Sequence, residues 1–509
     1  MRRQARSTKQ EASGWKWLAA CVALLALPAW GQEAPTTAEV DAAVRAVLGP
    51  PAQRWPLRDR NKGIGLTIWA QAEARPAMQY ALLPKAEETE KGNAVVKYMI
   101  AMASLPVYKE EESDLINAGR ADAPLAELNE KEKGFQAIIN GGYGFSLRML
   151  KEGARLDGVD WESSVRRQGY ATILPSLGQF RTAANVLALE IRFDIKRHDW
   201  AAAREKLATG FALARHLGQG ETLIGSLVGV AIGSMMCQTL EDWVAEPGAP
   251  NLYWPLANLP APFNDMRRAI DFERAGAYFT FPEMKEFKQG HYSADLWQSL
   301  LGRLEQFGGF SSSDPMLFAG ENASPGMMQM SAAVMGTLMY PQAKEFLVKR
   351  GMSREVVEKM PVVEALERYF VVSWDEEADD LFKWTGLPVK AATEGWQQEE
   401  HNMAVRSTAG EANWFATMLL PSVGKARVLG ARLDRQIAAL RIVEAIRAYA
   451  AEKGALPENL GALKLLVPAD PVREEAFVYE VQGGKAVVSS PGTEPRGLGG
   501  LRYELTLRK

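Results

Sequence analysis

The stretch that decides the fold runs from residue 177 to residue 240 and reads LGQFRTAANVLALEIRFDIKRHDWAAAREKLATGFALARHLGQGETLIGSLVGVAIGSMMCQTL. Apolar side chains recur every three or four residues over 177–197 and again over 200–217, the spacing of amphipathic helices. His198-Asp199 interrupts the first pattern, and Gly218-Gln219-Gly220 ends the second. Because so short a link leaves two helices antiparallel, the sequence predicts a helical hairpin.

Residues 222–240 carry no charge and place Gly225, Gly229 and Gly233 four residues apart. Such a segment is either a membrane-spanning helix with a small-residue packing stripe or a buried helix that its neighbours approach closely. Basic residues precede it and acidic residues follow it, which would place its N-terminal side in the cytoplasm. An exported chain has that side outside, so we favour the buried helix.

Export is predicted by residues 2–31. A basic head precedes an uncharged apolar run over 17–27, and small residues then precede Gln32, which is the layout of a secretory signal peptide covering 1–31. The run is too short to span a bilayer, which needs about 20 residues. Leu18-Ala-Ala-Cys21 also spells a lipobox, so a lipid anchor on Cys21 is a minor alternative. We expect a protein of the periplasm or cell envelope.

The bulk composition excludes some classes of partner. The 509-residue chain has a net charge of −3, and removal of the basic leader makes it more acidic. A nucleic-acid binder would carry a basic excess, so no nucleic-acid partner is expected. Cleavage removes Cys21 and leaves Cys237 alone, which rules out an intrachain disulfide. Folding must therefore rest on apolar burial.

The rest of the chain divides at two breaks and at one change of pattern. A connector with five prolines covers 247–262 and is expected to be extended, and a Gly/Ser/Pro-rich loop covers 308–326. We expect a helical domain over 32–430, subdivided near these breaks. Residues 431–509 then read as a helix that ends at Gly454, a strand hairpin turning at Gly483-Gly484 and a third strand over 501–507. The predicted fold class is mainly α, with irregular stacked helical hairpins and a small C-terminal α+β module.

Three resemblances accompany this pattern. The hairpin over 177–217 resembles part of a tetratricopeptide array, although no 34-residue period is sustained. The C-terminal run Tyr449-Ala-Ala-Glu-Lys-Gly-Ala-Leu-Pro457, with Pro468-Ala-Asp-Pro471, Phe477-Val-Tyr479 and Ser490-Pro-Gly492, resembles the globular part of a type II secretion major pseudopilin. Thr493-Glu-Pro-Arg-Gly497 replaces that family's aspartate-rich calcium loop, so only the local fold is implied. The run DWAAAREKLATGFALARHLGQGETLIG at 199–225 resembles a family of uncharacterised exported bacterial helical proteins.

Few side chains suggest chemistry. The four histidines have no metal-ligand spacing, and His216, at a predicted helix C-terminus, is expected to interact with the helix dipole. The acidic run over 375–380 is expected to be a solvated N-terminal helix face, but paired carboxylates can also hydrolyse glycosides. Asn251, Tyr253 and Trp254 in the connector form a candidate ligand platform, because rigid aromatic rings stack on sugars and peptides. The sequence predicts no catalytic residue, metal or cofactor.

These observations favour an exported, soluble, helical binding or scaffolding protein whose partner is an envelope protein, a peptide or a glycan. An envelope hydrolase that uses carboxylates is one alternative. An accessory protein of a secretion or pilus-like system is another, and it rests on the C-terminal module alone.

We expect an alkaline wash of membranes to release the mature protein, since residues 222–240 are predicted to pack inside protein instead of lipid. Fractionation of cells followed by the wash tests this. Recovery of the chain in the washed bilayer, with residues 222–240 protected by lipid, would contradict it.

Overall fold

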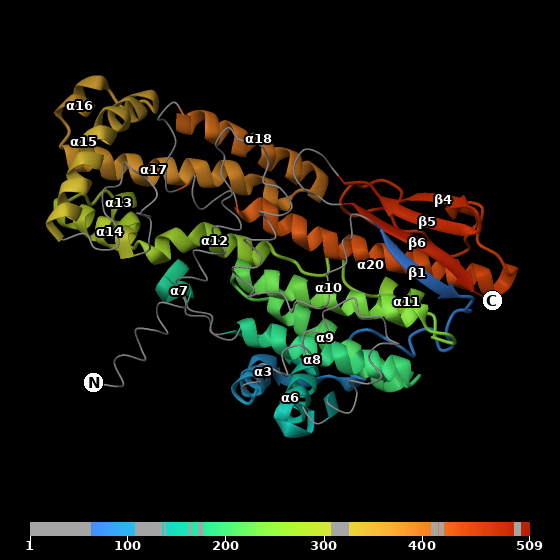
Figure 1. Cartoon of the computed structure of the whole chain (residues 1–509). Helices are drawn as coiled ribbons and strands as arrows, with labels where there is room; N and C mark the ends of the chain where they lie inside the picture. The colour runs from blue at the N-terminus through green and yellow to red at the C-terminus, as the bar shows by residue number, and fades with distance from the viewer. Residues whose placement is uncertain are drawn as a thin grey trace. The chain divides into compact units, whose positions relative to one another are not determined.

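The computed structural model describes residues 63–106, 135–136, 139–161, 165–171, 177–306, 325–408, 416, 422–492 and 500–508. The predicted signal peptide, the lipobox at Cys21 and most of the loop predicted at 308–326 lie outside these residues. The described chain is mainly α-helical with a small C-terminal α+β module, which confirms the predicted fold class (Figure 1). The chain forms two compact units, and the predicted domain boundaries stay a prediction. Unit 1 holds the described residues within 163–173 and 270–425, and unit 2 those within 48–162, 174–269 and 426–509.

Unit 2 is built on the predicted hairpin. Helix α8 (Leu177–Lys196) and helix α9 (Trp200–Gly218) pack against each other, and helix α10 (Leu223–Ala245) packs against both. His198 adopts a left-handed conformation with φ of 58°, which reverses the chain. Asp199 then caps α9 by accepting a hydrogen bond from the Ala202 amide at 3.0 Å. The two-residue link therefore acts as the sequence predicted.

The glycines of α10 are sites of close approach. A Cβ atom on Gly229 would lie 2.5 Å from the backbone oxygen of Ala214 in α9, and one on Gly233 would lie 2.7 Å from the Leu433 side chain. Among the described helices, α10 is the one long and apolar enough to cross a membrane, and 67% of its apolar window is buried within the protein. Most of the apolar surface of α10 is thus buried within the protein, where the helix packs against α8 and α9. The absence of a membrane span from the mature chain stays a prediction.

The sheet of unit 2 joins the two ends of the described chain. Its order is β1-β6-β5-β4. Strand β1 (Ile64–Trp69) pairs in parallel with β6 (Leu501–Arg508), while β5 (Lys485–Ser490) is antiparallel to β6 and to β4 (Val478–Gln482). The hairpin and the third strand were predicted. Strand β1 was missed because its partner lies more than 400 residues away, so no local pattern signals the pairing.

Two other segments of unit 2 differ from the prediction. Helix α20 (Ser422–Lys453) begins about two and a half turns before the expected start at residue 431. The proline-rich connector is not extended throughout, because helix α11 (Tyr253–Ala257) forms at its centre. Pro255 is the third residue of α11, within the first turn, where a missing N–H costs no helical hydrogen bond.

The remaining elements of unit 2 are short. Strands β2 and β3 pair in parallel. Helix α3 packs against α6, and α6 packs against α9. The bounds are η2 (Ala86–Glu88), β2 (Glu90–Asn93), α3 (Ala94–Ala103), η4 (Ile139–Tyr143), α6 (Gly144–Ala154), β3 (Leu156–Gly158) and η7 (Leu460–Ala462).

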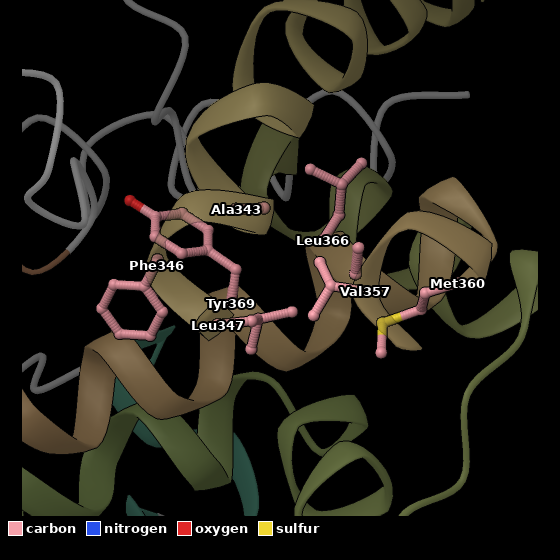
Figure 2. Packing of buried hydrophobic residues seen from close by; sticks show 8 residues of the cluster. Ala343, Phe346, Leu347, Val357, Met360, Leu366 and Tyr369 are labelled. Atoms are coloured by element: carbon pink, nitrogen blue, oxygen red, sulfur yellow. The ribbon is translucent and has the colours of Figure 1, made fainter. Parts of the chain in front are cut away.

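Unit 1 is helical. Its core packs α15 against α17 and α16, with α13 and α14 contacting α17. Figure 2 shows Phe346 and Leu347 of α15 against Leu366 and Tyr369 of α17, with Val357 of α16 closing the cluster. The elements are α7 (Val165–Gln168), η5 (Gly169–Ala171), α12 (Arg267–Thr280, which starts in unit 2), α13 (Glu283–Lys288), α14 (Ala294–Gln306), α15 (Pro325–Lys349), α16 (Arg354–Lys359), α17 (Val362–Phe382), η6 (Lys383–Gly386) and α18 (Val389–Thr408).

We predict that Gly229→Ala lowers the free energy of unfolding by about 1–3 kcal/mol, because the added methyl group forces α10 away from α9. Gly178→Ala is the matched control, since no atom lies within 4 Å of a Cβ built on that exposed residue of α8. The control should be neutral, or stabilising by up to about 1 kcal/mol. Urea denaturation of both variants tests this. Equal free energies of unfolding for the two variants would show that the close approach of α10 to α9 does not contribute to stability.

Candidate functional site

The connector is held in place by Asn251, which is buried. Its side-chain amide donates to the backbone oxygens of Gln71 at 3.2 Å and of Glu444 at 2.8 Å. Its side-chain oxygen accepts from the Tyr253 amide at 3.0 Å. One side chain therefore ties together the segment after β1, the connector and α20. Because the side-chain amide and oxygen are both hydrogen-bonded within the protein, the role of Asn251 is to position the candidate platform.

Tyr253 is also buried, and its hydroxyl is engaged. The hydroxyl donates to the backbone oxygen of Leu466 at 2.7 Å and accepts from the Arg441 guanidinium at 3.0 Å. The guanidinium carbon of Arg441 lies 4.9 Å from the centre of the tyrosine ring. This cation–π contact and the two hydrogen bonds fix the ring of Tyr253. Tyr253 is therefore a rigid support for its neighbour.

Trp254 is the member of the predicted trio that reaches the surface, with 38% of it exposed. Its indole Nε1 donates to a carboxylate oxygen of Glu73 at 2.5 Å. The indole meets the Tyr253 ring edge-on, with the centroids 5.0 Å apart. Leu466 beside them is 77% exposed, and Arg441 makes no ion pair with any described residue. We call Tyr253, Trp254, Arg441 and Leu466 the Trp254 platform.

The acidic run over 375–380 lies at the C-terminal end of α17, because that helix begins at Val362, after Pro361. The prediction of an N-terminal helix face is therefore wrong. At this end the macrodipole disfavours carboxylates. Basic residues outside α17 compensate for it, and the pairs are Lys288–Asp375, Arg350–Glu376, Arg406–Glu377, Arg274–Asp379 and Lys383–Asp380.

The geometry of these pairs is that of ties between helices. Glu377 is buried and accepts two hydrogen bonds from Arg406 of α18, at 3.0 and 2.5 Å. Asp375 accepts from the Tyr278 hydroxyl at 2.5 Å and from Lys288 at 2.6 Å. A glycosidase needs one carboxyl group that keeps its proton beside one that stays ionised. Here each of the five carboxyl groups is instead paired with a basic side chain, which is an arrangement for holding segments together.

Glu367 is a carboxyl group that the sequence analysis missed. Burial, with a smaller contribution from the nearby Glu364, raises its pKa to about 7. The Ser293 amide donates to the carboxylate at 3.3 Å, and this hydrogen bond acts in the opposite direction by lowering the pKa. Its side chain has no exposed surface. Glu367 therefore exchanges its proton near neutral pH, but it is buried away from the surface where a substrate would bind. No local pattern signals it, because its burial comes from the packing of α17 against α13 and α14.

His216 differs from its prediction. Burial, and to a lesser degree the charge of Arg215, lower its pKa to about 4, so the ring is neutral at pH 7 and does not offer a cation to the helix dipole. Its Nδ1 lies 2.7 Å from the Tyr98 hydroxyl. Its backbone oxygen accepts from the Trp161 indole at 2.9 Å. His216 is therefore part of an aromatic cluster that fastens α3 to the end of α9.

Within the part of the chain that the structure describes, no three His, Cys, Asp or Glu side chains are placed to hold a metal ion. No family model matches the chain, and neither a curated protein nor a solved structure is significantly similar to it. The ligand-binding role of Asn251, Tyr253 and Trp254 and both family resemblances stay predictions.

We predict that acid destabilises the protein partly through His216. The pKa of His216 is lowered in the folded state, so between about pH 6.5 and 4 the unfolded chain binds more protons. Stability is therefore lost as the pH falls through that range, by about 1.4 kcal/mol per pH unit from this group.

His216→Gln, which can still form a hydrogen bond with Tyr98, should flatten this part of the pH dependence. His401→Gln removes an exposed histidine and should follow the wild type. Urea denaturation at pH 7, 6 and 5 measures the effect. An unchanged slope in His216→Gln would show that the ring is protonated in the folded protein.

Proposed function

We propose that the protein is an exported binding or scaffolding protein of the periplasm or cell envelope, and that the Trp254 platform contacts its ligand. The observation that carries this proposal is the half-exposed indole of Trp254 on a turn whose neighbours are fixed by hydrogen bonds. A ring that is already ordered loses little conformational entropy when a ligand binds to it.

The chemistry of the platform favours a ligand with an apolar surface and a carboxylate. The Nε1 group of Trp254 is occupied by Glu73, so the indole offers mainly its apolar ring to a partner. Leu466 extends this apolar surface. Arg441 adds a guanidinium that no described carboxylate neutralises. Peptides with acidic termini and acidic glycans both carry such groups, and both remain within the proposal.

An envelope hydrolase is the alternative, and the contacts around α17 make it the weaker one. The carboxylates that suggested it are paired with arginine and lysine side chains of other segments. Glu367, whose pKa burial raises to about 7, is fully buried. Support for the secretion accessory still rests on the sequence of the C-terminal module.

We predict that Trp254→Ala weakens binding of a platform ligand by about tenfold or more, since an aromatic anchor at the centre of a contact typically contributes more than 1.4 kcal/mol. Isothermal titration of the mature protein with envelope glycan fragments and with acidic peptides measures the affinity. Phe145→Ala is the matched control, because it also removes an exposed aromatic ring from unit 2, with 42% of that residue exposed.

Binding that both variants retain equally would remove the platform from the proposal. Turnover of a glycan or peptide library by the wild-type protein, with no binding to envelope material, would reverse the ranking in favour of the hydrolase.

A further inference from the structure

Strand β4 forms an edge of the four-stranded sheet. It pairs with β5 on one side, and no described strand pairs with its other side. Its sequence is Val478-Tyr-Glu-Val-Gln482, and every residue except Tyr479 is exposed. Figure 1 shows β4 at the outer border of this sheet. An unpaired strand edge is a template for another strand.

The turn after β4 determines which backbone groups face outward. Gly483 and Gly484 have φ of 61° and 78°, the conformation of a two-residue type I′ turn. In such a hairpin the residues that flank the turn, Gln482 and Lys485, form a hydrogen-bonded pair. The pairing then alternates, so Val478, Glu480 and Gln482 bond to β5. The N–H and C=O groups of Tyr479 and Val481 face outward.

Apart from its short length and the charge of Glu480, this edge has little protection against pairing. Natural edge strands carry prolines, lysines or bulges that block an added strand. The β4 stretch has none of these, and its register with β5 runs unbroken over five pairs. Val478 and Val481 are 43% and 44% exposed, one on each face of the strand. Glu480 is the one charged residue in β4, and it makes no ion pair with a described residue.

We propose that the outer edge of β4 binds an extended segment of a partner protein as a fifth, antiparallel strand that places a basic residue opposite Glu480. Tyr479 and Val481 would form the backbone hydrogen bonds. Glu480 would then occupy a non-hydrogen-bonded pair, where facing side chains lie closest and a charge is felt most strongly. Charge complementarity thus sets the chemistry of the partner. The proposal is independent of the Trp254 platform.

A second copy of this chain fits the edge less well. In the antiparallel register that pairs all five residues, Glu480 of one chain faces Glu480 of the other. Like charges directly opposite each other destabilise a strand pair. The same argument disfavours any strand with an acidic residue at this position.

The test uses two labelled, capped heptapeptides and the full mature chain. One peptide is Thr-Val-Thr-Lys-Thr-Val-Thr, and the other has glutamate in place of lysine. Fluorescence anisotropy should show that the wild type binds the lysine peptide about fivefold more tightly. Glu480→Lys should reverse this preference. The absence of a preference, or a preference that Glu480→Lys leaves unchanged, would overturn the proposal.

A second pair of variants tests the backbone contact. Val481→Pro removes an outward N–H and none of the donors to β5, so binding of the lysine peptide should be lost. Val481→Ala keeps that N–H and should bind within about threefold of the wild type. Hydrogen exchange should show new protection at Tyr479 and Val481 when the peptide binds to the wild type. This measurement does not require the variants to fold. Phe145→Ala, which removes an exposed ring that belongs to neither proposed binding surface, should leave peptide binding unchanged.

Two results would reassign the edge. A concentration-dependent dimer that Val481→Pro abolishes would identify a second copy as the occupant. Equal protection of all five amides before the peptide is added would show that the edge is already covered.

Discussion

The structure of unit 2 depends on one buried guanidinium, that of Arg447 in α20. It donates to the backbone oxygen of Trp69 at 3.0 Å, to the backbone oxygen of Ala249 at 2.7 Å and to Glu444 at 2.8 Å. β1, the connector and the last long helix are thereby joined, although up to 378 residues separate them in sequence. A buried charge is tolerated when it is paired and hydrogen-bonded, and removal of one partner typically costs about 3–5 kcal/mol. Arg447 meets both conditions and also donates to two backbone carbonyl groups.

The same arrangement recurs along α20. Asp470 is fully buried, pairs with Arg435 at 3.1 Å and also accepts from Ser490 of β5. Glu241 of α10 accepts from Gln436 at 3.1 Å and from Tyr503 of β6 at 2.7 Å. Each of these hydrogen bonds and ion pairs requires a particular angle and distance, whereas apolar burial is not directional. The buried polar groups therefore fix where the sheet and the connector sit along the helix, which places Trp254 at the surface and leaves β4 at the edge.

Charge in unit 1 serves a similar purpose. The acidic end of α17 is tied to cations of α12, α13 and α18 and to Arg350 directly after α15, so the residues that first suggested hydrolysis instead hold a helical bundle together. The two surfaces that we propose for partners, the Trp254 platform and the edge of β4, consist of aromatic, aliphatic and backbone groups with one charged side chain each. Such surfaces suit recognition more than bond cleavage, and this is why binding is the function that we propose.

The sequence by itself determined the local structure. The spacing of apolar residues gave the α8–α9 hairpin, and Asp199, Gly454 and Gly483-Gly484 marked the ends and turns, because these signals act within a few residues. It also indicated that the glycine-striped segment is buried. Only the tertiary structure decided which distant groups meet. The pairing of β1 with β6, the burial of Asn251 and Tyr253, the neutral His216 and the cations around α17 all depend on side chains far away in sequence. Neither periodicity nor composition records such contacts, since they arise when separate elements pack together.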